Sequence, residues 1–531
     1  MARILIVTSR LAEPIVREAV ALSNTRHYVE ILVAPVDVAA FLSTDYIAKL
    51  LLSRGIKKGD YDYILVPGLA RGSGRVVEEA IGIKTFKGCT IAYDLTELLK
   101  LEDLSTLSED SPADDILQKL FIDRNKRLLI EVEEKARLNG FSVGNLHIPL
   151  VPPPIRVASE VASAHRVDES LLYKRVVYLI ESGADIVSLG FEALEPHPDD
   201  VYRIVRFLKR EFDVAIAIDT PIPSEISRGV EAGCDMVINI DLTNIDRVVD
   251  YVKDVAVAVI PRDPSTGSIP FSSSQRIELL IKTIDYVKSL GVEKILADAV
   301  LDPPGSTFNS MIAYHSFKML HPEIPMFMGI GNVTELVDID SVGVNALLVL
   351  LAQEIGVSIV LTSECSTKTY GSTRETKIAT QMAALAKTMK TMPKNLGISL
   401  LILKDKKRVK VPLDSDAEIV TATEKDTEYA LDPLGIFKID VNHDEGFIEA
   451  LYIGRKGKIL IRGKTAKAIR DEILSRELVS SLSHAIYLGI ELAKAEEALR
   501  TGKNCIQELP LFILPKPIEL RNSGIKTFAR K

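Results

Sequence analysis

The feature that most constrains the fold is a run of eight short apolar segments, each followed by a helical pattern. The segments lie near residues 155, 185, 214, 235, 255, 294, 326 and 358. Eight strand-helix units in roughly 245 residues have the length and rhythm of a closed parallel barrel. The sequence therefore predicts a (β/α)8 TIM barrel over residues 149–398.

The part of the chain before this barrel has a different α/β pattern. Residues 1–148 alternate helical patterns with apolar segments, and we expect strands at ARILIVTS, VEILVAP, YDYILVPG and CTIAYDL. This alternation predicts an N-terminal three-layer Rossmann-like α/β domain. Pro149 and Pro152 to Pro154 interrupt regular structure and mark the boundary.

The part after the barrel changes again. Residues 399–531 contain the apolar segments ISLLILKD, GIFKIDV and GKILIRG, followed by one long helical pattern from Thr465 to about Arg500. We therefore expect a small C-terminal α+β domain, so that the whole chain is of the α/β class with a central TIM barrel. His484 in the long helical pattern is either a ligand or, as we favour, a packed or capping histidine.

Composition and charge argue against several classes of protein. The net charge is -8 and no basic tract is present, which argues against nucleic acid as a partner. No apolar run approaches the about 18 residues that a membrane helix needs, and the first residues lack the pattern of a signal peptide. The four cysteines lie far apart, without ligand or disulfide spacing. These features predict a cytoplasmic protein, and we expect a homo-oligomer.

The N-terminal domain contains a glycine-rich loop, Gly68 to Gly74, between an expected strand and an expected helix. Its backbone N–H groups could bind an anion. The spacing matches neither the Walker nor the dinucleotide motif, so a turn that requires glycine is the favoured interpretation.

Polar residues follow the expected barrel strands where each strand ends. In chain order the expected substrate-binding residues are Glu160, Glu192, Asp219, Asn239, Asp298, Asn332 and Ser363. Carboxyl ends of barrel strands meet at one mouth, where TIM barrels build active sites. The alternative is that some of these side chains only cap helices. Several carboxylates and amides with few cations suit a flat heterocycle with adjacent ring N–H and amino donors, such as a pterin.

Several of these segments also resemble a known family. SGADIVSLGFEA (182–193), AIDT (217–220), GCDMVIN (233–239) and KILADAVLDPP (294–304) resemble the pterin-binding barrel shared by dihydropteroate synthases and corrinoid-dependent methyltetrahydrofolate methyltransferases. MGIGNVTELVDIDSVGVNA (328–346) and the flanking domains resemble the archaeal dihydropteroate synthase-related proteins, over nearly the whole chain. In that family the N- and C-terminal domains are uncharacterised.

The resemblance implies that Asp219, Asn239 and Asp298 hold the pterin ring. Glu192 falls where synthases have an acidic loop residue. The synthase Ser-Arg-Lys after strand seven is replaced by Gly-Asn-Val, whose Asn332 resembles the methyltransferase asparagine. The synthase Arg-x-His after strand eight is absent, so Lys368 and Arg374 are the expected catalytic cations, in a loop that could bind an anion at a helix start.

Three functions stay open at this point. A synthase-like transferase would condense a dihydropterin diphosphate with an arylamine, with Mg²⁺, in folate or methanopterin-type cofactor biosynthesis. A methyltetrahydropterin methyltransferase would need a separate corrinoid protein, because no Asp-x-His-x-x-Gly motif is present. A third function is a pterin-binding protein without catalysis. We favour the first.

Overall fold

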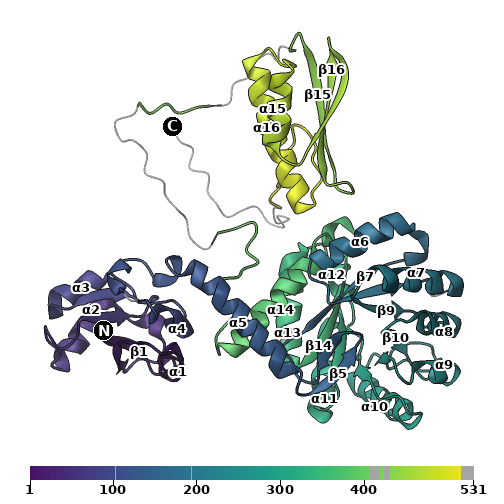
Figure 1. Cartoon of the computed structure of the whole chain (residues 1–531), viewed down its shortest axis with the longest axis horizontal. Coiled ribbons are helices and arrows are strands. Elements are labelled where there is room, and N and C mark those ends of the chain that lie inside the picture. Colours follow the sequence, from purple (N-terminus) through teal and green to yellow (C-terminus); the bar gives the residue numbers. More distant parts are fainter. Residues whose placement is uncertain (102, 193, 406–417, 424–430, 516–531) are drawn as a thin grey trace, which may run out of the picture. The chain divides into compact units, whose positions relative to one another are not determined.

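The computed structural model describes residues 1–101, 103–192, 194–405, 418–423 and 431–515 (Figure 1). The chain divides into two compact units, Met1–Lys407 and Arg408–Lys531. The first holds the N-terminal domain and the barrel, and the second holds the C-terminal domain.

The centre of the first unit is a closed barrel of eight parallel strands, which confirms the prediction (Figure 1). The strands are β7 (Arg156–Val161), β8 (Ile186–Gly190), β9 (Ala215–Asp219), β10 (Met236–Ile240), β11 (Ala256–Val259), β12 (Ile295–Ala297), β13 (Met326–Gly329) and β14 (Val357–Ser363). The register of β14 against β7 closes the barrel. Each strand lies at one of the eight apolar segments of the sequence, because a strand buried on both faces is apolar throughout.

Helices surround the strands on the outside (Figure 1). They are α6 (Glu169–Glu181), α7 (Pro198–Glu211), α8 (Pro223–Ala232), α9 (Ile245–Val252), α10 (Ser273–Ser289), α11 (Thr307–Leu320), α12 (Gly331–Thr334), α13 (Ser341–Ile355) and α14 (Ser372–Thr388). In α7, for example, the buried residues Val201, Ile204, Val205 and Leu208 recur at helical spacing and face the strands. This packing fixes the direction of each strand and hence the position of each strand end.

A two-stranded hairpin covers the opposite end of the barrel from the polar residues. It consists of β5 (Gly140–Val143) and β6 (Leu146–Pro149). Val143 and Ile148 belong to one buried cluster with residues at the starts of the barrel strands, such as Ala158 and Ile186. The expected domain boundary at residues 148/149 therefore falls inside β6, in a hairpin that packs on the barrel.

The N-terminal domain is a four-stranded parallel sheet in the order β2-β1-β3-β4, with helices on both faces. The strands are β1 (Arg3–Ser9), β2 (Tyr28–Ala34), β3 (Tyr63–Val66) and β4 (Lys84–Lys87), and the helices are α1 (Glu13–Ser23), α2 (Thr44–Ser53), α3 (Gly74–Ile81) and α4 (Leu95–Leu98). The next helix, α5 (Gln118–Ala136), packs against α14 of the barrel. Residues of α1 and α4 pack in a cluster on one face, and residues of α2 and α3 in a cluster on the other. The three-layer Rossmann-like architecture is confirmed.

The prediction of the fourth N-terminal strand was wrong. The strand is Lys84–Lys87, whereas CTIAYDL leads into a short 3-10 helix, Ala92–Asp94, and then α4. Thr90 donates to Asp114, which turns the chain out of the sheet. An edge strand flanked by lysines lacks the apolar run on which the prediction depended.

Several N–H groups of the loop from Gly68 to Gly74 are already used within the protein. The N–H groups of Gly68, Arg71 and Gly74 donate to the carbonyl oxygens of Cys89, Leu42 and Glu109. A cavity of about 110 Å³ beside the loop has a mainly apolar lining that includes Val7, Leu69 and Cys89. Both observations favour the turn over the anion site.

The C-terminal unit is an antiparallel sheet of β15 (Gly435–Asn442), β16 (Phe447–Gly454) and β17 (Gly457–Gly463), with helices α15 (Ala466–Ser475) and α16 (Leu482–Thr501). Ile448, Ala450, Ile469 and Leu492 belong to one buried cluster of the sheet and helices. His484 is 4% exposed and its Nδ1 lies 3.2 Å from Asp432 Oδ2. The interpretation as a packed histidine therefore fits the structure.

Three details of this unit differ from the prediction. The single long helix is interrupted at residues 476–481, where Leu478 turns into the core and the Ser481 hydroxyl caps α16. FIEALYIG forms β16, which the sequence analysis missed. Glu449 interrupts its apolar run, and Gly446 and Gly454 flank or end it, so the segment did not show a clear strand pattern. The expected strand ISLLILKD (398–405) is absent from these described residues. Leu401, Ile402 and Leu403 are exposed there, so their apolar side chains pack into no sheet.

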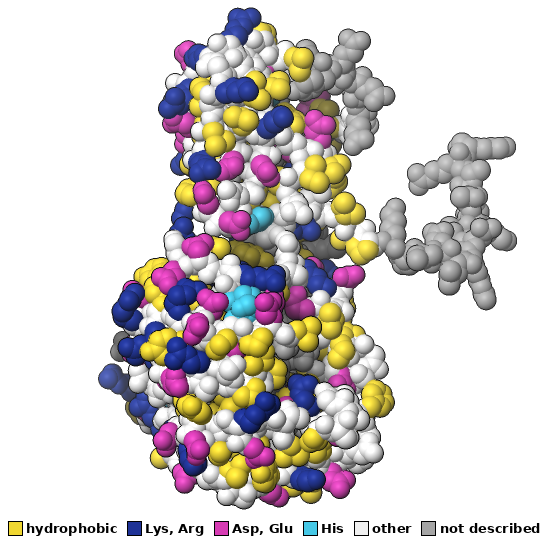
Figure 2. All heavy atoms as spheres, turned by 90° about the vertical axis from the view of Figure 1, so that its right-hand side faces the viewer, with side chains coloured by type: hydrophobic (Ala, Val, Ile, Leu, Met, Phe, Trp, Pro, Cys, Tyr) yellow, Lys and Arg dark blue, Asp and Glu magenta, His cyan; other side chains and the backbone are white. Residues whose placement is uncertain are grey.

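The surface carries charges of both signs. Figure 2 shows acidic and basic side chains interspersed over one face, without a continuous basic area. Among the described residues, no helix has both the length and the apolar character required to cross a membrane.

Candidate active site

The carboxyl ends of the barrel strands bring Glu160, Asp219 and Asp298 to one mouth. Strand register places Glu160 opposite Ser188 of β8 on one side and opposite Ser363 of β14 on the other. Asp219 ends β9, and Asp298 directly follows β12. The structure thus places the three carboxyl groups at the end of the barrel that the sequence indicated.

Asp219 and Asn239 form a pair across neighbouring strands. The Asn239 amide Nδ2 donates to Asp219 Oδ1. Asn239 has a φ of 71°, in the left-handed region that asparagine tolerates better than most residues, and its carbonyl accepts a 2.9 Å bond from Asn244 Nδ2. Burial and the nearby Asp298 raise the pKa of Asp219 to about 6, although the bond from Asn239 opposes this shift.

Asp298 is held by a helix and by its own loop. The Tyr314 hydroxyl of α11 donates to Asp298 Oδ1, and the Val300 N–H donates to the same oxygen at 2.8 Å. Burial raises the pKa of Asp298 to about 6, and these bonds and the charge of Arg276 oppose the shift. Asp298 as a whole residue is 7% exposed, and the second oxygen of its carboxyl is the atom that a ligand could use.

Arg276 of α10 fixes the loop after Asp298. Its guanidinium donates to the carbonyl of Val300 at 2.8 Å and forms two 3.0 Å bonds to the carboxylate of Asp302. Val300 has a φ of 62°, which is costly for a β-branched residue. The buried arginine therefore stabilises a strained loop that positions Asp298.

Glu160 is the third carboxyl of the mouth with a raised pKa. Burial, Asp219 and Glu335 raise its pKa to about 7. Its Oε1 lies where a side chain at residue 190 would begin, because a Cβ built on Gly190 comes within 2.3 Å of that atom. Gly190 thus leaves the space in which the Glu160 carboxyl lies.

We expect Gly190→Ala to displace the Glu160 carboxyl and to lower stability by about 1 kcal/mol, the low end of the cost of overpacking, because the atom that the new Cβ meets ends a flexible side chain. Thermal unfolding measures this loss. Gly343→Ala is the matched control, since a Cβ there meets no atom within 4 Å, and we expect it to keep or slightly raise stability. Equal melting temperatures for the two variants would contradict the assigned role of Gly190.

The residues expected after strands seven and eight lie at the same end of the barrel but have partners. Asn332, in α12, donates from Nδ2 to the Leu301 carbonyl at 2.9 Å. Ser363 Oγ lies 2.8 Å from Cys365 Sγ. Lys368 donates to the Val337 carbonyl at 2.7 Å and to Asp338 at 3.3 Å, and Arg374 is exposed on the first turn of α14.

The start of α14 is occupied by a side chain of the protein. Glu364 accepts from the N–H groups of Gly371 and Thr373 at 2.8 and 2.9 Å. These donors are therefore already used, as in an ordinary helix cap. Glu335 fastens the same loop, since its carboxylate accepts from Ser366 Oγ at 2.6 Å and Thr369 Oγ1 at 2.7 Å. Any anion role of Lys368 and Arg374 thus depends on their side chains.

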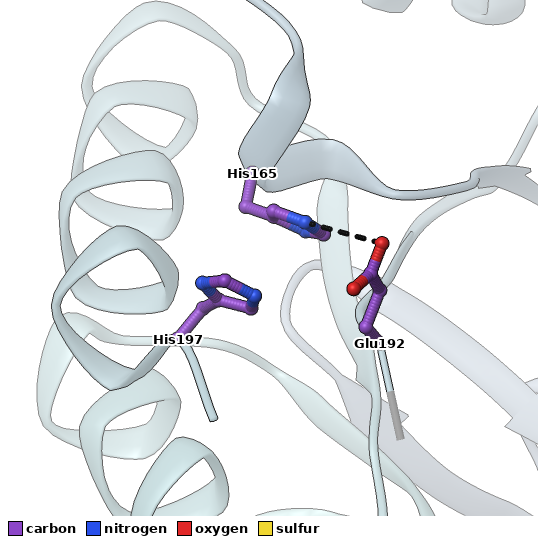
Figure 3. Close-up of side chains that lie close together, drawn as sticks. All are labelled: His165, Glu192 and His197. Atoms are coloured by element: carbon purple, nitrogen blue, oxygen red, sulfur yellow. Dashed lines mark ion pairs between the residues drawn. The ribbon is translucent and has the colours of Figure 1, made fainter. Parts of the chain in front are cut away.

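Glu192 lies in a different group of residues. It pairs with Arg166, and its Oε1 is 3.7 Å from Nε2 of His165 (Figure 3). His197 lies beside His165, with the two rings stacked. The sequence interpretation missed both histidines, as well as Tyr314, Arg276, Glu335 and Gly190. Most of these come from helices and loops that only the folded chain brings to the site.

Comparison with known proteins gives a relative over the full length. The chain is 36% identical to an uncharacterized protein, MJ0107, of Methanocaldococcus jannaschii, over 96% of this chain and 99% of the relative. Residues 431–508, which hold the C-terminal sheet and helices, match the family model PterinBD-DUF4346. The chain belongs to the archaeal dihydropteroate synthase-related family.

Solved structures similar to this family member include two bacterial enzymes. The dihydropteroate synthase of Yersinia pestis with a pterine-sulfa conjugate is 16% identical, with a TM-score of 0.38, over 46% of this chain and 98% of that one. The dihydropteroate synthase of Xanthomonas albilineans in complex with 7,8-dihydropteroate is 18% identical, with a TM-score of 0.33, over 43% and 90%. The full-length relative, and not these structures, shows the family.

Proposed function

We propose that the barrel binds a pterin and condenses a dihydropterin diphosphate with an arylamine, as a step of folate or methanopterin-type cofactor biosynthesis. One observation carries the proposal. Asp219 and Asp298 are acceptor groups at the ends of β9 and β12 at the barrel mouth, and each has a pKa raised to about 6. Ring N–H and amino donors of a pterin would supply the hydrogen bonds that favour the ionised carboxylates.

In the proposed reaction the residues divide by task. Asp298 and Asp219 accept the donors of the heterocycle, and Asn239 fixes the orientation of Asp219. The amine nitrogen attacks the exocyclic methylene carbon, the bond to the diphosphate oxygen breaks, and the amine loses one proton. Solvent water accepts that proton, because Glu160 is assigned to the Mg²⁺ ion. Lys368 and Arg374 are the proposed cations for the leaving diphosphate.

Mg²⁺ fits the oxygen donors of this mouth. Glu160 and Ser363 are register partners on adjacent strands, and carboxylate and hydroxyl oxygens suit Mg²⁺. These two residues would hold the ion, which would neutralise charge on the diphosphate. Glu335, which raises the pKa of Glu160, adds negative charge that a cation would offset.

Methyl transfer from a methylated tetrahydropterin is the second candidate. Asn332 favours it, because its Nδ2 is anchored to the Leu301 carbonyl and the carboxamide is thereby held at the mouth. Calorimetric titration distinguishes the two functions. Tighter binding of dihydropterin diphosphate with Mg²⁺ than without supports condensation. Preference for the methylated pterin supports methyl transfer, and no binding of either pterin contradicts both proposals.

Pterin affinity should fall as the pH is lowered. Both aspartates are ionised at pH 7.5, and each takes up a proton as the pH falls through its pKa of about 6. A protonated carboxyl cannot form the charge-assisted bond to the pterin. One pH unit below its pKa only about a tenth of a carboxyl is ionised, so each aspartate makes the pterin affinity roughly tenfold weaker there. Calorimetry between about pH 5 and pH 8 measures this. An affinity that stays constant over that range would contradict the role of the carboxylates.

A further inference from the structure

A second cluster of possible ligand atoms lies at the barrel mouth, apart from the carboxyl groups assigned to the pterin. One ring nitrogen of His165, one of His197 and one carboxylate oxygen of Glu192 all lie within 4.8 Å of one another (Figure 3). We propose that these three residues bind a divalent transition metal ion such as Zn²⁺, with an open position toward solvent.

Three separate elements bring the ligands together. His165 lies in the 3-10 helix Ala164–Arg166 after β7, and Glu192 follows β8. His197 directly precedes α7, and its N–H donates to Glu225 Oε1 at 2.7 Å. Glu225 is fully buried and its other oxygen accepts from the Thr220 hydroxyl, next to Asp219. His197 is therefore anchored to the strand end that carries the expected pterin site.

Each of the two histidines has one buried ring nitrogen without a hydrogen-bond partner among the described residues. In His197 this nitrogen is Nε2. In His165 it is Nδ1, whereas the other nitrogen of that ring, Nε2, faces Glu192. A buried ring nitrogen without a partner costs free energy. The distance of 3.7 Å from His165 Nε2 to Glu192 Oε1 exceeds a hydrogen bond. It is closer to the separation of about 3.4 Å that two ligands have around tetrahedral Zn²⁺.

The second ring nitrogen of His197 supports the same assignment. Its Nδ1 lies 3.9 Å from Asp200 Oδ2. Metal-binding histidines commonly donate their other N–H to a carboxylate, which fixes the ring. Nε2 is therefore the ligand atom of His197. Asp200 is too far for a hydrogen bond in this conformation and would become the partner of Nδ1 once the ring turns.

Metal binding requires two movements of side chains. The rings of His165 and His197 are stacked, with centroids 4.0 Å apart and planes 13° from parallel. A nitrogen lone pair lies in the plane of its ring, so two parallel rings cannot both point at one ion. The ring of His197 must turn about its side-chain bonds, and no hydrogen bond of that ring opposes the turn. Arg166, which is exposed, must leave the Glu192 oxygen.

The ligand types select the ion. Two imidazoles and one carboxylate with an open position suit Zn²⁺, Co²⁺ or Fe²⁺, whereas Mg²⁺ prefers oxygen ligands alone. The site is thus chemically distinct from the oxygen ligands of Glu160 and Ser363. It does not depend on the pterin proposal, because metal binding is measured without any pterin.

Equilibrium dialysis of the chelator-treated full chain against Zn²⁺ tests the site, followed by metal analysis. We expect one tightly bound ion per chain, and binding at least about tenfold weaker in His197→Ala and in Glu192→Gln. His321→Ala is the matched control, since His321 pairs with Glu323 at the surface and lies outside the cluster. Co²⁺ in place of Zn²⁺ should give visible absorption bands that both site variants lose.

The result that overturns the proposal is equally specific. It is a Zn²⁺ affinity and stoichiometry in Glu192→Gln and His197→Ala equal to those of the unaltered chain. Glu192 is partly exposed, so Glu192→Gln is the variant that should stay folded, and its thermal unfolding checks this. Loss of metal binding in that folded variant supports the site whether or not the histidine variant folds.

Discussion

Exchange of Asp219 or Asp298 for Asn weakens pterin binding at least about tenfold and leaves the folded barrel intact. Each change replaces a charged acceptor with a neutral amide of the same shape. The Asn side chain still accepts from Asn239 or Tyr314 through its oxygen, so the neighbouring bonds can persist. Calorimetric titration with a dihydropterin measures the loss.

Neither Asp219→Asn nor Asp298→Asn should lower the free energy of unfolding. In this respect the two aspartates differ from residues of the hydrophobic core. The pKa of both aspartates is raised from the usual range near 4 to about 6, so the folded state disfavours their ionised forms. Stability contributed by such groups is lost as the pH rises from about 4 through 6. At pH 7.5 the variants should therefore melt at or above the temperature of the unaltered chain. Unchanged pterin affinity in both variants would show that the pocket is assigned wrongly.

Exchange of Arg276 for Met should cost about 3–5 kcal/mol of folding free energy, because it leaves the Asp302 carboxylate, only 14% exposed, without its partner. Arg276 is 1% exposed and bonds Asp302 and the carbonyls of Pro270, Ala299 and Val300. Its loss also releases the strained Val300 loop beside Asp298. Chemical or thermal unfolding measures the stability, and pterin titration of any folded variant measures the effect on the site.

Two controls test this explanation. Arg228→Met removes exposed ion pairs of α8 and should cost less than about 1 kcal/mol. The double variant Arg276→Met and Asp302→Leu removes both charges and should recover part of the loss, because no unpaired carboxylate remains. A single variant as stable as the Arg228 control would contradict the role of Arg276.

The sequence predicted the barrel well because its strands are buried on both faces and so form uninterrupted apolar runs. It failed at β4 and β16, whose lysines, glutamate and glycines lie at edges or half-exposed faces. The helix break before Ser481 was missed for another reason. Leu478 continues the apolar spacing of the helix although its backbone leaves the helix to bury that side chain.

In the candidate site, too, the residues next to buried apolar strands were predicted and the others were not. Asp219, Asn239 and Asp298 were found because they follow apolar strands directly, and strand order alone brings them to one mouth. Tyr314, Arg276 and His197 belong to helices or helix starts, where polar residues are common and sequence position does not show direction. A carboxylate near a helix start can also bind free N–H groups of its own chain, as Glu364 does at the start of α14.

The hairpin of residues 140–149 limits how this protein can be rearranged by recombination. Val143 and Ile148 complete the hydrophobic floor of the barrel, while the residues just before them belong to α5, which packs with α14. A barrel inherited or cut out from residue 149 onward would expose that floor to water. The part of the chain that must be kept together is therefore α5, the hairpin and the barrel. To exchange the N-terminal domain alone, the junction must lie before α5.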